Sequence, residues 1–424
     1  NGVQKYGGDF EGELTHDGNF CCDGLVFANR SFKAGSLEAK AAYQPIRTHC
    51  DGRALTVYNR LDFTNLNEYT LRYWIEVDGV KQNVTETVLD AAPHTSVSVE
   101  IGYEPVPCQF GATLNVSLLK AGAEAAHTQH LLPHIAPAEE KRRGLQLTED
   151  GDLIHARGEG FGYSFSKHYG AFISIRVNGK EQLACRPRLS ACRAPTDNDR
   201  NIRFRWLQLD EWQGENLDKA FIKVYDCRVK DNAILVSGAL AGVSRTPVLR
   251  FTQKIEIAED GEIGVALCGT VRQDAIWLPR LGFEWELPAD VTAFAYYGNG
   301  PVESYRDMCH AGRIGLYESD AVSEYVPYVR PQEHGNHTAV KMLRIGGLEF
   351  RAEQEMEIQV SRYSTAALLK AEHTDELVAD GKTHLRIDYK VSGLGSNSCG
   401  PELEKRHRLD EKEIQFTFFI RPRA

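Results

Sequence analysis

The stretch YTLRYWIEVDGV at residues 69–80 decides the fold class. Apolar side chains occupy every second position from 69 to 77, and the positions between them include Thr70, Arg72 and Glu76. Because successive side chains of a strand point to opposite faces, this period of two predicts a half-buried β-strand. Asp78 and Gly79 follow directly, and this dipeptide is a strong signal for a hairpin turn.

The same alternation recurs along almost the whole chain. It appears in four further stretches: ISIRVNGKE (173–181), KIEIAEDGEIGVAL (254–267), LRIDYKV (385–391) and IQFTFFI (414–420). Helical periodicity is scarce, and its clearest case is SLEAKAAY at 36–43, where Ser36 is placed to cap a short helix. Because strands follow strands at short turn spacing, the sequence predicts an all-β architecture of sandwiches rather than an α/β fold.

The length of the chain indicates more than one domain. A chain of 424 residues with 42% hydrophobic content exceeds the size at which a single core stops growing. The stretch LPHIAPAEEKRRG, within 132–146, combines prolines with a run of charges and has no strand pattern. We therefore expect a domain boundary there, with an immunoglobulin-sized sandwich over about 45–131 and a much larger unit of strands after it.

Charge and cysteine usage restrict the class of protein. A formal net charge of −10 gives no reason to expect binding to nucleic acid or to an anionic membrane, and no apolar run is long enough to cross a bilayer. The ten cysteines are scattered without C-x-x-C spacing, which favours reduced core thiols over disulfides or a zinc site. The chain begins with Asn1 rather than Met, and we therefore expect a processed product or a piece of a longer protein.

The most polar candidate site is RAPTDND at 193–199. Asp197 and Asp199 could form a metal site or a catalytic carboxylate pair, but they would diverge in an extended segment. Asp, Asn and Pro together are strong turn formers, because Asx side chains bond nearby backbone amides. The residues themselves therefore favour a polar loop held by its own side chains.

Three other stretches suggest chemistry more weakly. YYGNGPVESYRDMCH at 296–310 resembles a glycine-rich cradle, but no helix pattern follows it, and we expect a turn between strands. QEHGNHT at 332–338 carries His334 and His337, which could share a metal, although its Gly and Asn favour a loop. Cys399 lies in GLGSNSCGP, where the residue types favour a loop over a nucleophilic thiol.

Seven ordered segments carry a resemblance that covers essentially the whole chain. They are YGGDF (6–10), NFCCDGLVFANR (19–30), CRAPTDNDRN (192–201), YYGNGPVESYRD (296–307), YVPYVRPQEHGN (325–336), SRYS (361–364) and GLGSNSCGP (393–401). In this order they resemble the C-terminal half of the large β-galactosidases of glycoside hydrolase family 2. The resemblance implies the tail of a (β/α)8 catalytic barrel over 1–44, an immunoglobulin-like sandwich over 45–135, and a large galactose-mutarotase-like β-sandwich over 140–424.

The resemblance also implies that the catalytic residues are absent. In the family, the acid/base glutamate and the nucleophilic glutamate lie on barrel strands ahead of the segment that YGGDF resembles, and nothing in this chain matches them. Hydrolysis with retention needs both carboxylates. We therefore predict no catalytic residue in this chain and no turnover of lactose by the chain alone.

Some residues resemble the rim of the family's active site. Phe20 and Asp23 match positions that bind sodium near the sugar, although the family pattern has asparagine in place of Asp23. Arg200 and Asn201 resemble the start of a mobile loop at the mouth of the site, with Asn201 in place of a glycine. Cys399 stands where some members carry a tryptophan that stacks on the substrate. RAPTDND is then expected to be the structured root of that loop.

The leading hypothesis is a non-catalytic part of a cytoplasmic, retaining β-galactosidase. Its implied cofactors, sodium and magnesium, belong to the complete enzyme, and so do its galactoside substrate and an expected homo-oligomeric state. The alternatives are the small subunit of a split β-galactosidase, a mutarotase acting through a His and Glu pair, and a sugar-binding module. For the module, the candidate aromatic platforms are Trp206, Trp212, Tyr296 and Tyr297.

Overall fold

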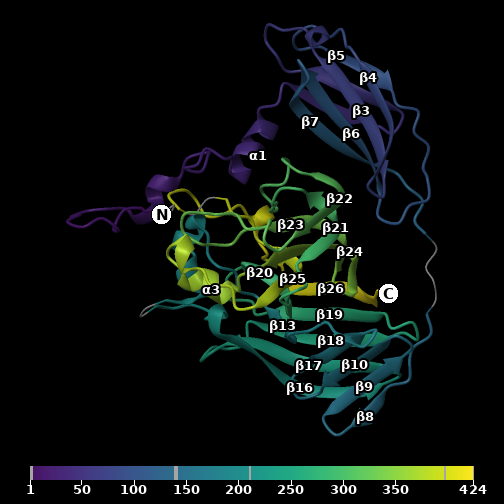
Figure 1. Ribbon diagram of the computed structural model, residues 1–424, viewed down its shortest axis with the longest axis vertical. Helices are drawn as coiled ribbons and strands as arrows, with labels where there is room; N and C mark the ends of the chain where they lie inside the picture. The colour runs from purple at the N-terminus through teal and green to yellow at the C-terminus, as the bar shows by residue number, and fades with distance from the viewer. Residues whose placement is uncertain (1–2, 138–141, 210–211, 396–397, 424) are drawn as a thin grey trace.

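The computed structural model describes residues 3–137, 142–209, 212–395 and 398–423, and it is built mainly from antiparallel strands (Figure 1). The predicted all-β fold class is confirmed. In the described part of the chain the helices are few and short, and none has the length and apolar character to cross a membrane.

The stretch at 69–80 forms a hairpin in the smaller of two sandwiches. One sheet of this small sandwich has three strands, in the order β1 (Ile46–Cys50), β2 (Ala54–Asn59) and β5 (Ser96–Glu100). The other has four, in the order β4 (Val80–Thr87), β3 (Thr70–Val77), β6 (Ala112–Lys120) and β7 (Ala123–Leu132). Asp78 and Gly79 join β3 to β4 with φ angles of 51° and 81°, as a two-residue hairpin turn requires. Inward residues such as Leu55, Leu71 and Leu114 form the core between the sheets.

Most of the described chain after the small sandwich folds into a large sandwich. Its smaller sheet has the order β12 (Lys180–Glu181), β11 (Ala171–Val177), β10 (Phe161–Ser166), β9 (Leu153–Gly158) and β8 (Thr148–Asp150). The main path of its larger sheet has the order β13 (Cys185–Ser190), β20 (Arg280–Pro288), β25 (Lys382–Val391), β24 (Leu348–Ser361), β26 (Glu413–Pro422), β19 (Ile263–Val271), β18 (Leu249–Ile257), β17 (Ala233–Gly242) and β16 (Ala220–Lys230). A branch of the larger sheet contains β23 (Asn336–Ile345), β21 (Ala293–Gly300) and β22 (Arg313–Asp320).

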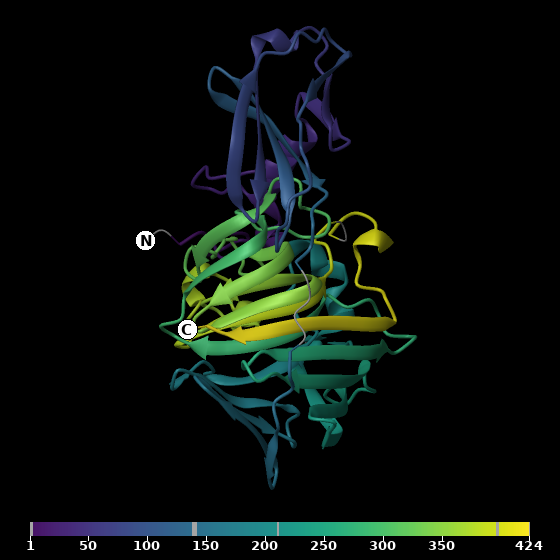
Figure 2. The same ribbon diagram turned by 90° about the vertical axis from the view of Figure 1, so that its right-hand side faces the viewer.

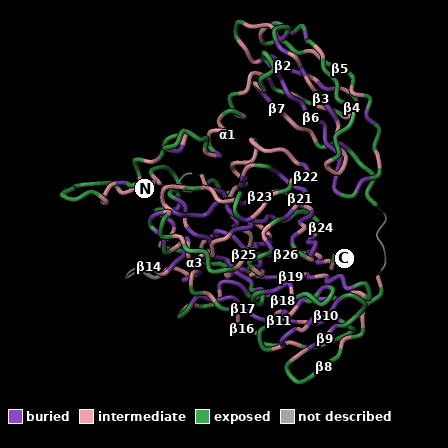
Figure 3. Tube along the Cα trace, viewed as in Figure 1, coloured by how far each residue is buried: buried purple, intermediate pink, exposed green. Residues whose placement is uncertain are grey.

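The remaining elements are short. They are the two-residue strands β14 (Gln208–Leu209) and β15 (Trp212–Gln213), the helices α1 (Ala34–Ala42), α2 (Arg203–Trp206) and α3 (Thr365–Lys370), and the 3₁₀ helices Gly18–Cys22, Leu66–Glu68, Asp197–Asn201, Leu217–Lys219, Thr374–Glu376 and Lys405–His407. Figure 3 shows that buried residues concentrate in the large sandwich, whereas the N-terminal segment is mostly exposed or half-buried. That segment lies beside the large sandwich in Figure 1.

The helix expected at 36–43 exists, but its start was predicted wrongly. α1 begins at Ala34 after Lys33, so Ser36 lies inside the first turn and does not cap it. The Ser36 hydroxyl donates instead to the carbonyl of Leu25. A serine near a helix start can thus bond a backbone carbonyl outside the helix in place of capping it.

The two sandwiches are joined by specific polar contacts, and Figure 2 shows the small one at one end of the elongated molecule. The side-chain amide of Gln129 accepts from the backbone N–H of Ile314 and donates to its carbonyl, both at 2.7 Å. Beside this pair, Arg313 donates to the carboxylate of Glu124 at 2.7 Å. α1 adds to the interface, because its Glu38 carboxylate accepts from the backbone N–H of Ala311 at 2.9 Å.

Candidate functional site

A cleft of about 590 Å³ lies where stretches of chain far apart in the sequence meet. Its wall comes from the N-terminal segment between 16 and 36, from the loop between 195 and 203, and from the stretch between 328 and 333. The lining is completed by Met308, Leu394 and Ser398. The cleft is therefore shared between the segment that precedes the small sandwich and the loops of the large one.

One wall of the cleft is built on a buried ion pair within RAPTDND. The Arg193 guanidinium is fully buried and donates to both carboxylate oxygens of Asp199, at 2.7 and 3.1 Å. It also donates to the carbonyls of Ser392 and Gly393, at 2.6 and 3.2 Å. The Asp199 carboxylate in turn accepts from the backbone N–H of Thr196 at 2.9 Å. These bonds hold the loop from within and leave Asp199 no freedom to act as a catalytic carboxylate.

The other carboxylate of the stretch, Asp197, points outward and bridges two walls of the cleft. The Asn19 amide donates to one of its oxygens at 2.6 Å, and the Gln332 amide donates to the other at 3.0 Å. The backbone N–H of Asp197 also donates to Gln332 at 3.1 Å. Asp197 and Asp199 thus have separate structural partners, as expected for a structured loop rather than a catalytic pair.

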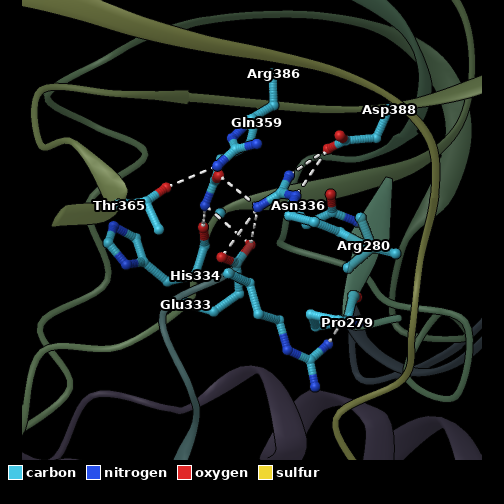
Figure 4. Close-up of polar contacts among 12 residues, drawn as sticks. Pro279, Arg280, Glu333, His334, Asn336, Gln359, Thr365, Arg386 and Asp388 are labelled. Carbon is cyan, nitrogen blue, oxygen red and sulfur yellow. Dashed lines mark hydrogen bonds and ion pairs between the residues drawn. The ribbon is translucent and has the colours of Figure 1, made fainter. Parts of the chain in front are cut away.

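A second buried ionic network, shown in Figure 4, includes Glu333, which also lines the cleft. The Arg280 guanidinium donates to Glu333 at 3.0 Å, to Gln359 at 3.1 Å and to Asp388. Burial alone would lower the pKa of Arg280, but the carboxylates of Asp388 and Glu333 outweigh it and raise that pKa. The backbone N–H of Glu333 donates to the carbonyl of Ala194, which ties the network to the RAPTDND loop.

Sequence reasoning missed the Arg280 network because its members come from separate strands and loops. The available signal was the pair of charges at positions 386 and 388 of LRIDYKV, on the face of the strand that alternation assigns to solvent. Both are buried in the structure, Arg386 at 3% exposure and Asp388 at 0%. Charged groups are rarely buried so fully unless they are paired.

The wall around Tyr328 is anchored by another buried carboxylate. The Tyr328 hydroxyl donates to Glu303 at 2.6 Å, and the backbone N–H of Gly335 donates to the same carboxylate at 2.7 Å. Burial raises the pKa of Glu303 above its usual range. Since Tyr328 lines the cleft, Glu303 holds the wall in place without reaching the cavity.

The residues predicted for the site fall in or near the cleft. Phe20, Asp23 and Arg200 line it. The Asn201 amide donates to the carbonyl of Ser398 at 3.0 Å, which connects the loop to the turn that carries Cys399. Cys399 is exposed and follows the lining residue Ser398. Among the described residues, no three His, Cys, Asp or Glu side chains converge as metal ligands.

Three of the four aromatic residues considered as sugar platforms are buried and not available for stacking. Trp206 is fully buried, and its indole N–H donates to the carbonyl of Trp277 at 2.9 Å. Tyr296 and Tyr297 are exposed by only 1% and 2%. The interpretation of these three as exposed platforms is wrong, because they pack in the interior; the side chain of Trp212 lies outside the described part of the structure.

The stretch QEHGNHT is only partly a loop. His334 precedes β23, and its ring bonds the carbonyl of Gln332 at 2.8 Å. His337 lies inside β23, where it is fully buried and bonded to Glu324 at 2.9 Å. The prediction of a loop is therefore wrong for His337, since the strand begins at Asn336.

Comparisons with known proteins give matches to β-galactosidases. The family described as beta galactosidase small chain matches residues 157–420, and beta-galactosidase, domain 4, matches residues 55–133. A β-galactosidase of Actinobacillus pleuropneumoniae is 32% identical over 99% of this chain and 43% of its own length. One from Staphylococcus xylosus is 26% identical, over 99% of this chain and 44% of its own length. The chain thus spans less than half the length of these relatives.

Solved structures of sugar epimerases align with the chain at low similarity. A putative aldose 1-epimerase from Escherichia coli K12 has a TM-score of 0.36 and 13% identity, over 65% of this chain and 99% of its own. The match to the small-chain family spans most of the large sandwich and includes every lining residue of the cleft except those of the N-terminal segment between 16 and 36. The chain belongs to the β-galactosidase small-chain family.

Proposed function

We propose that the chain is the C-terminal, non-catalytic portion of a retaining β-galactosidase that hydrolyses terminal β-D-galactosides such as lactose. In this role it supplies scaffold and the rim of the active site. The observation that supports this most directly is the cleft, because the rim residues Phe20, Asp23 and Arg200 line one cavity although up to 180 positions separate them.

The bond-breaking carboxylates come from elsewhere in the complete enzyme under this proposal. Glycoside hydrolysis with retention needs an acid/base and a nucleophile about 5 Å apart across the sugar. Within the cleft wall, Asp199 is paired with Arg193, Glu333 is paired with Arg280, and Asp197 is held by two amides. The part of the relatives that this chain does not cover is the expected source of both catalytic groups.

A hard cation fits the donors that the rim provides. The Phe20 carbonyl and the Asp23 carboxylate are oxygen donors, which sodium and magnesium prefer. Further ligands would have to come from the uncovered part of the enzyme. When bound, the cation would polarise and orient a sugar hydroxyl, while Asp23 would hold the ion at the rim.

The proposal is tested by assaying the chain alone and with a partner. Alone, it is expected to release no nitrophenol from nitrophenyl β-D-galactoside. Expressed together with the portion of the Actinobacillus β-galactosidase that it does not match, it is expected to restore hydrolysis. Release by the purified chain alone would overturn the non-catalytic assignment.

The rim role is tested within the active complex. Asp197→Ala removes the bridge between Asn19 and Gln332, and it is expected to raise KM by about tenfold, which corresponds to the loss of one or two hydrogen bonds. Asp290→Ala is the matched control, since Asp290 is an exposed aspartate paired only with Lys180 among the described residues. Equal kinetics for the two variants would argue against the cleft as the substrate site.

A further inference from the structure

The 3₁₀ helix Gly18–Cys22 ends in two adjacent cysteines, Cys21 and Cys22. Their sulfur atoms lie 3.8 Å apart. Cys21 is exposed, and Cys22 is half-buried and lines the cleft. No other two cysteines of the chain are adjacent in the sequence. The turn therefore presents two thiols side by side at an accessible edge of the cleft.

The spacing of the sulfur atoms suits one shared centre. Two sulfurs bonded at about 2.3 Å to one centre lie about 3.8 Å apart at a tetrahedral angle and about 3.3 Å apart at the near-right angle of a pyramidal trivalent centre, so a small side-chain rotation brings this pair into range. A disulfide needs its sulfurs at about 2 Å and its Cα atoms usually more than about 4.4 Å apart, whereas neighbouring Cα atoms lie at about 3.8 Å. The two sulfurs are thus better arranged to bind one shared atom than to form a disulfide with each other.

The surroundings of the two thiols indicate which kind of element they would bind. Thiolates favour soft, thiophilic elements over hard cations. Structural zinc needs four protein ligands, but among the described residues no third His, Cys, Asp or Glu joins the pair. A trivalent organoarsenical needs only two thiolates, because its carbon substituent completes the coordination. The backbone is also fixed, since Lys33 donates to the Cys22 carbonyl at 2.6 Å.

We propose that Cys21 and Cys22 form a dithiol site for trivalent organoarsenicals at the rim of the cleft. With an arsine oxide, both S–H bonds and the arsenic–oxygen bond break, and two arsenic–sulfur bonds form. The two thiol protons leave with the oxygen as water, and no electrons are transferred. Because the same helix carries Asn19, which bonds Asp197, the adduct adds bulk next to the bridge across the cleft.

The test uses phenylarsine oxide and the reduced chain, with the adduct measured by intact mass and located by peptide mapping. One equivalent is expected per chain, bridging Cys21 and Cys22, removable by a dithiol but not by a monothiol. Cys21→Ser and Cys22→Ser are each expected to weaken binding by about 100-fold or more, because the second bond is intramolecular. Cys268→Ser, which removes another exposed cysteine, is expected to bind as the parent chain does.

Two results would overturn the site. One is unchanged binding in the double variant Cys21→Ser with Cys22→Ser. The other is single variants that bind as tightly as the parent, which would indicate attachment through one thiol. Because the readout is the adduct itself, the outcome is independent of whether the chain is part of a β-galactosidase.

Discussion

At the scale of single residues, the Arg193–Asp199 pair determines what RAPTDND is. Sequence reasoning could predict a polar turn, because the residue types are local turn formers. It could not identify the partners of Arg193, since the carbonyls of Ser392 and Gly393 lie about 200 positions away in the chain. The buried Arg193 guanidinium bonds a carboxylate of its own loop and two carbonyls that are distant in the sequence. The conformation of this short loop therefore depends on the fold of the large sandwich.

Replacing Asp199 with Asn should destabilise the protein strongly. The substitution keeps the shape but leaves the fully buried Arg193 without its counter-charge, and breaking such a pair typically costs about 3 to 5 kcal/mol. Urea unfolding should show the loss as a lower midpoint. Asp197→Asn is the matched control, because Asp197 is exposed. The asparagine keeps one oxygen that can still accept a hydrogen bond from one of the two amide partners. A midpoint unchanged in both variants would contradict the role of the pair.

At the scale of elements, the alternation of apolar and polar residues predicted the positions of the strands well. It predicted less well which faces of the strands are buried. The hairpins at Asp78–Gly79 and Asn178–Gly179 follow from the turn residues, and all four have positive φ. In contrast, Arg386 and Asp388 of β25 are both buried although they lie on the polar face of the alternation, which the period of two cannot foresee. The rim residues were found through resemblance, because no local pattern connects residue 20 with residue 200.

The turn after β25 offers a prediction about close packing. Asp307 accepts from the backbone N–H groups of Leu394 and Gly395, at 3.0 and 2.7 Å, and an added Cβ on Gly393 would lie 2.5 Å from its carboxyl carbon. Gly393→Ala is therefore expected to lower stability by about 1 to 3 kcal/mol. Gly162→Ala, in β10 with open space around it, should change stability little. Thermal unfolding of both variants measures the difference, and equal melting temperatures would refute the packing account.

At the scale of the whole molecule, the N-terminal segment docks on the large sandwich through a titratable contact. The Tyr6 ring stacks on His373 at 4.7 Å, and the His373 ring bonds Asp9 at 2.8 Å. The bond to Asp9 raises the pKa of His373 above 6.5, and the bonds from Tyr6 and His373 lower the pKa of Asp9 below 3.8. The contact also has a neutral part, because the Tyr6 hydroxyl donates to the carbonyl of Glu372.

Docking of this segment should depend on pH. Because folding raises the pKa of His373, its contact stabilises the docked segment fully at pH values below the unfolded pKa of 6.5. That stabilisation is lost as the pH rises through the raised pKa of the folded state. The aspartate acts in the opposite sense and loses its contribution only as the pH falls below 3.8. Hydrogen exchange of residues 6–10 is therefore expected to be slower, relative to the intrinsic rate, at pH 6 than at pH 8.5. In Asp9→Asn the difference should shrink, and an undiminished difference would exclude the pair as its cause.

The contact between Gln129 and Ile314 has a consequence for how this protein can evolve. The Gln129 amide exchanges two bonds with the main-chain groups of Ile314, in the manner of a strand pairing with its neighbour, and its nitrogen also donates to the side chain of Asn115. These two bonds do not depend on the side chain at position 314, but the Ile314 side chain packs against Phe110, Tyr297 and Met342, so packing also constrains that position. Apolar replacements at position 314 should therefore be tolerated best, whereas position 129 admits few replacements of any kind, because it needs a donor and an acceptor on one planar group.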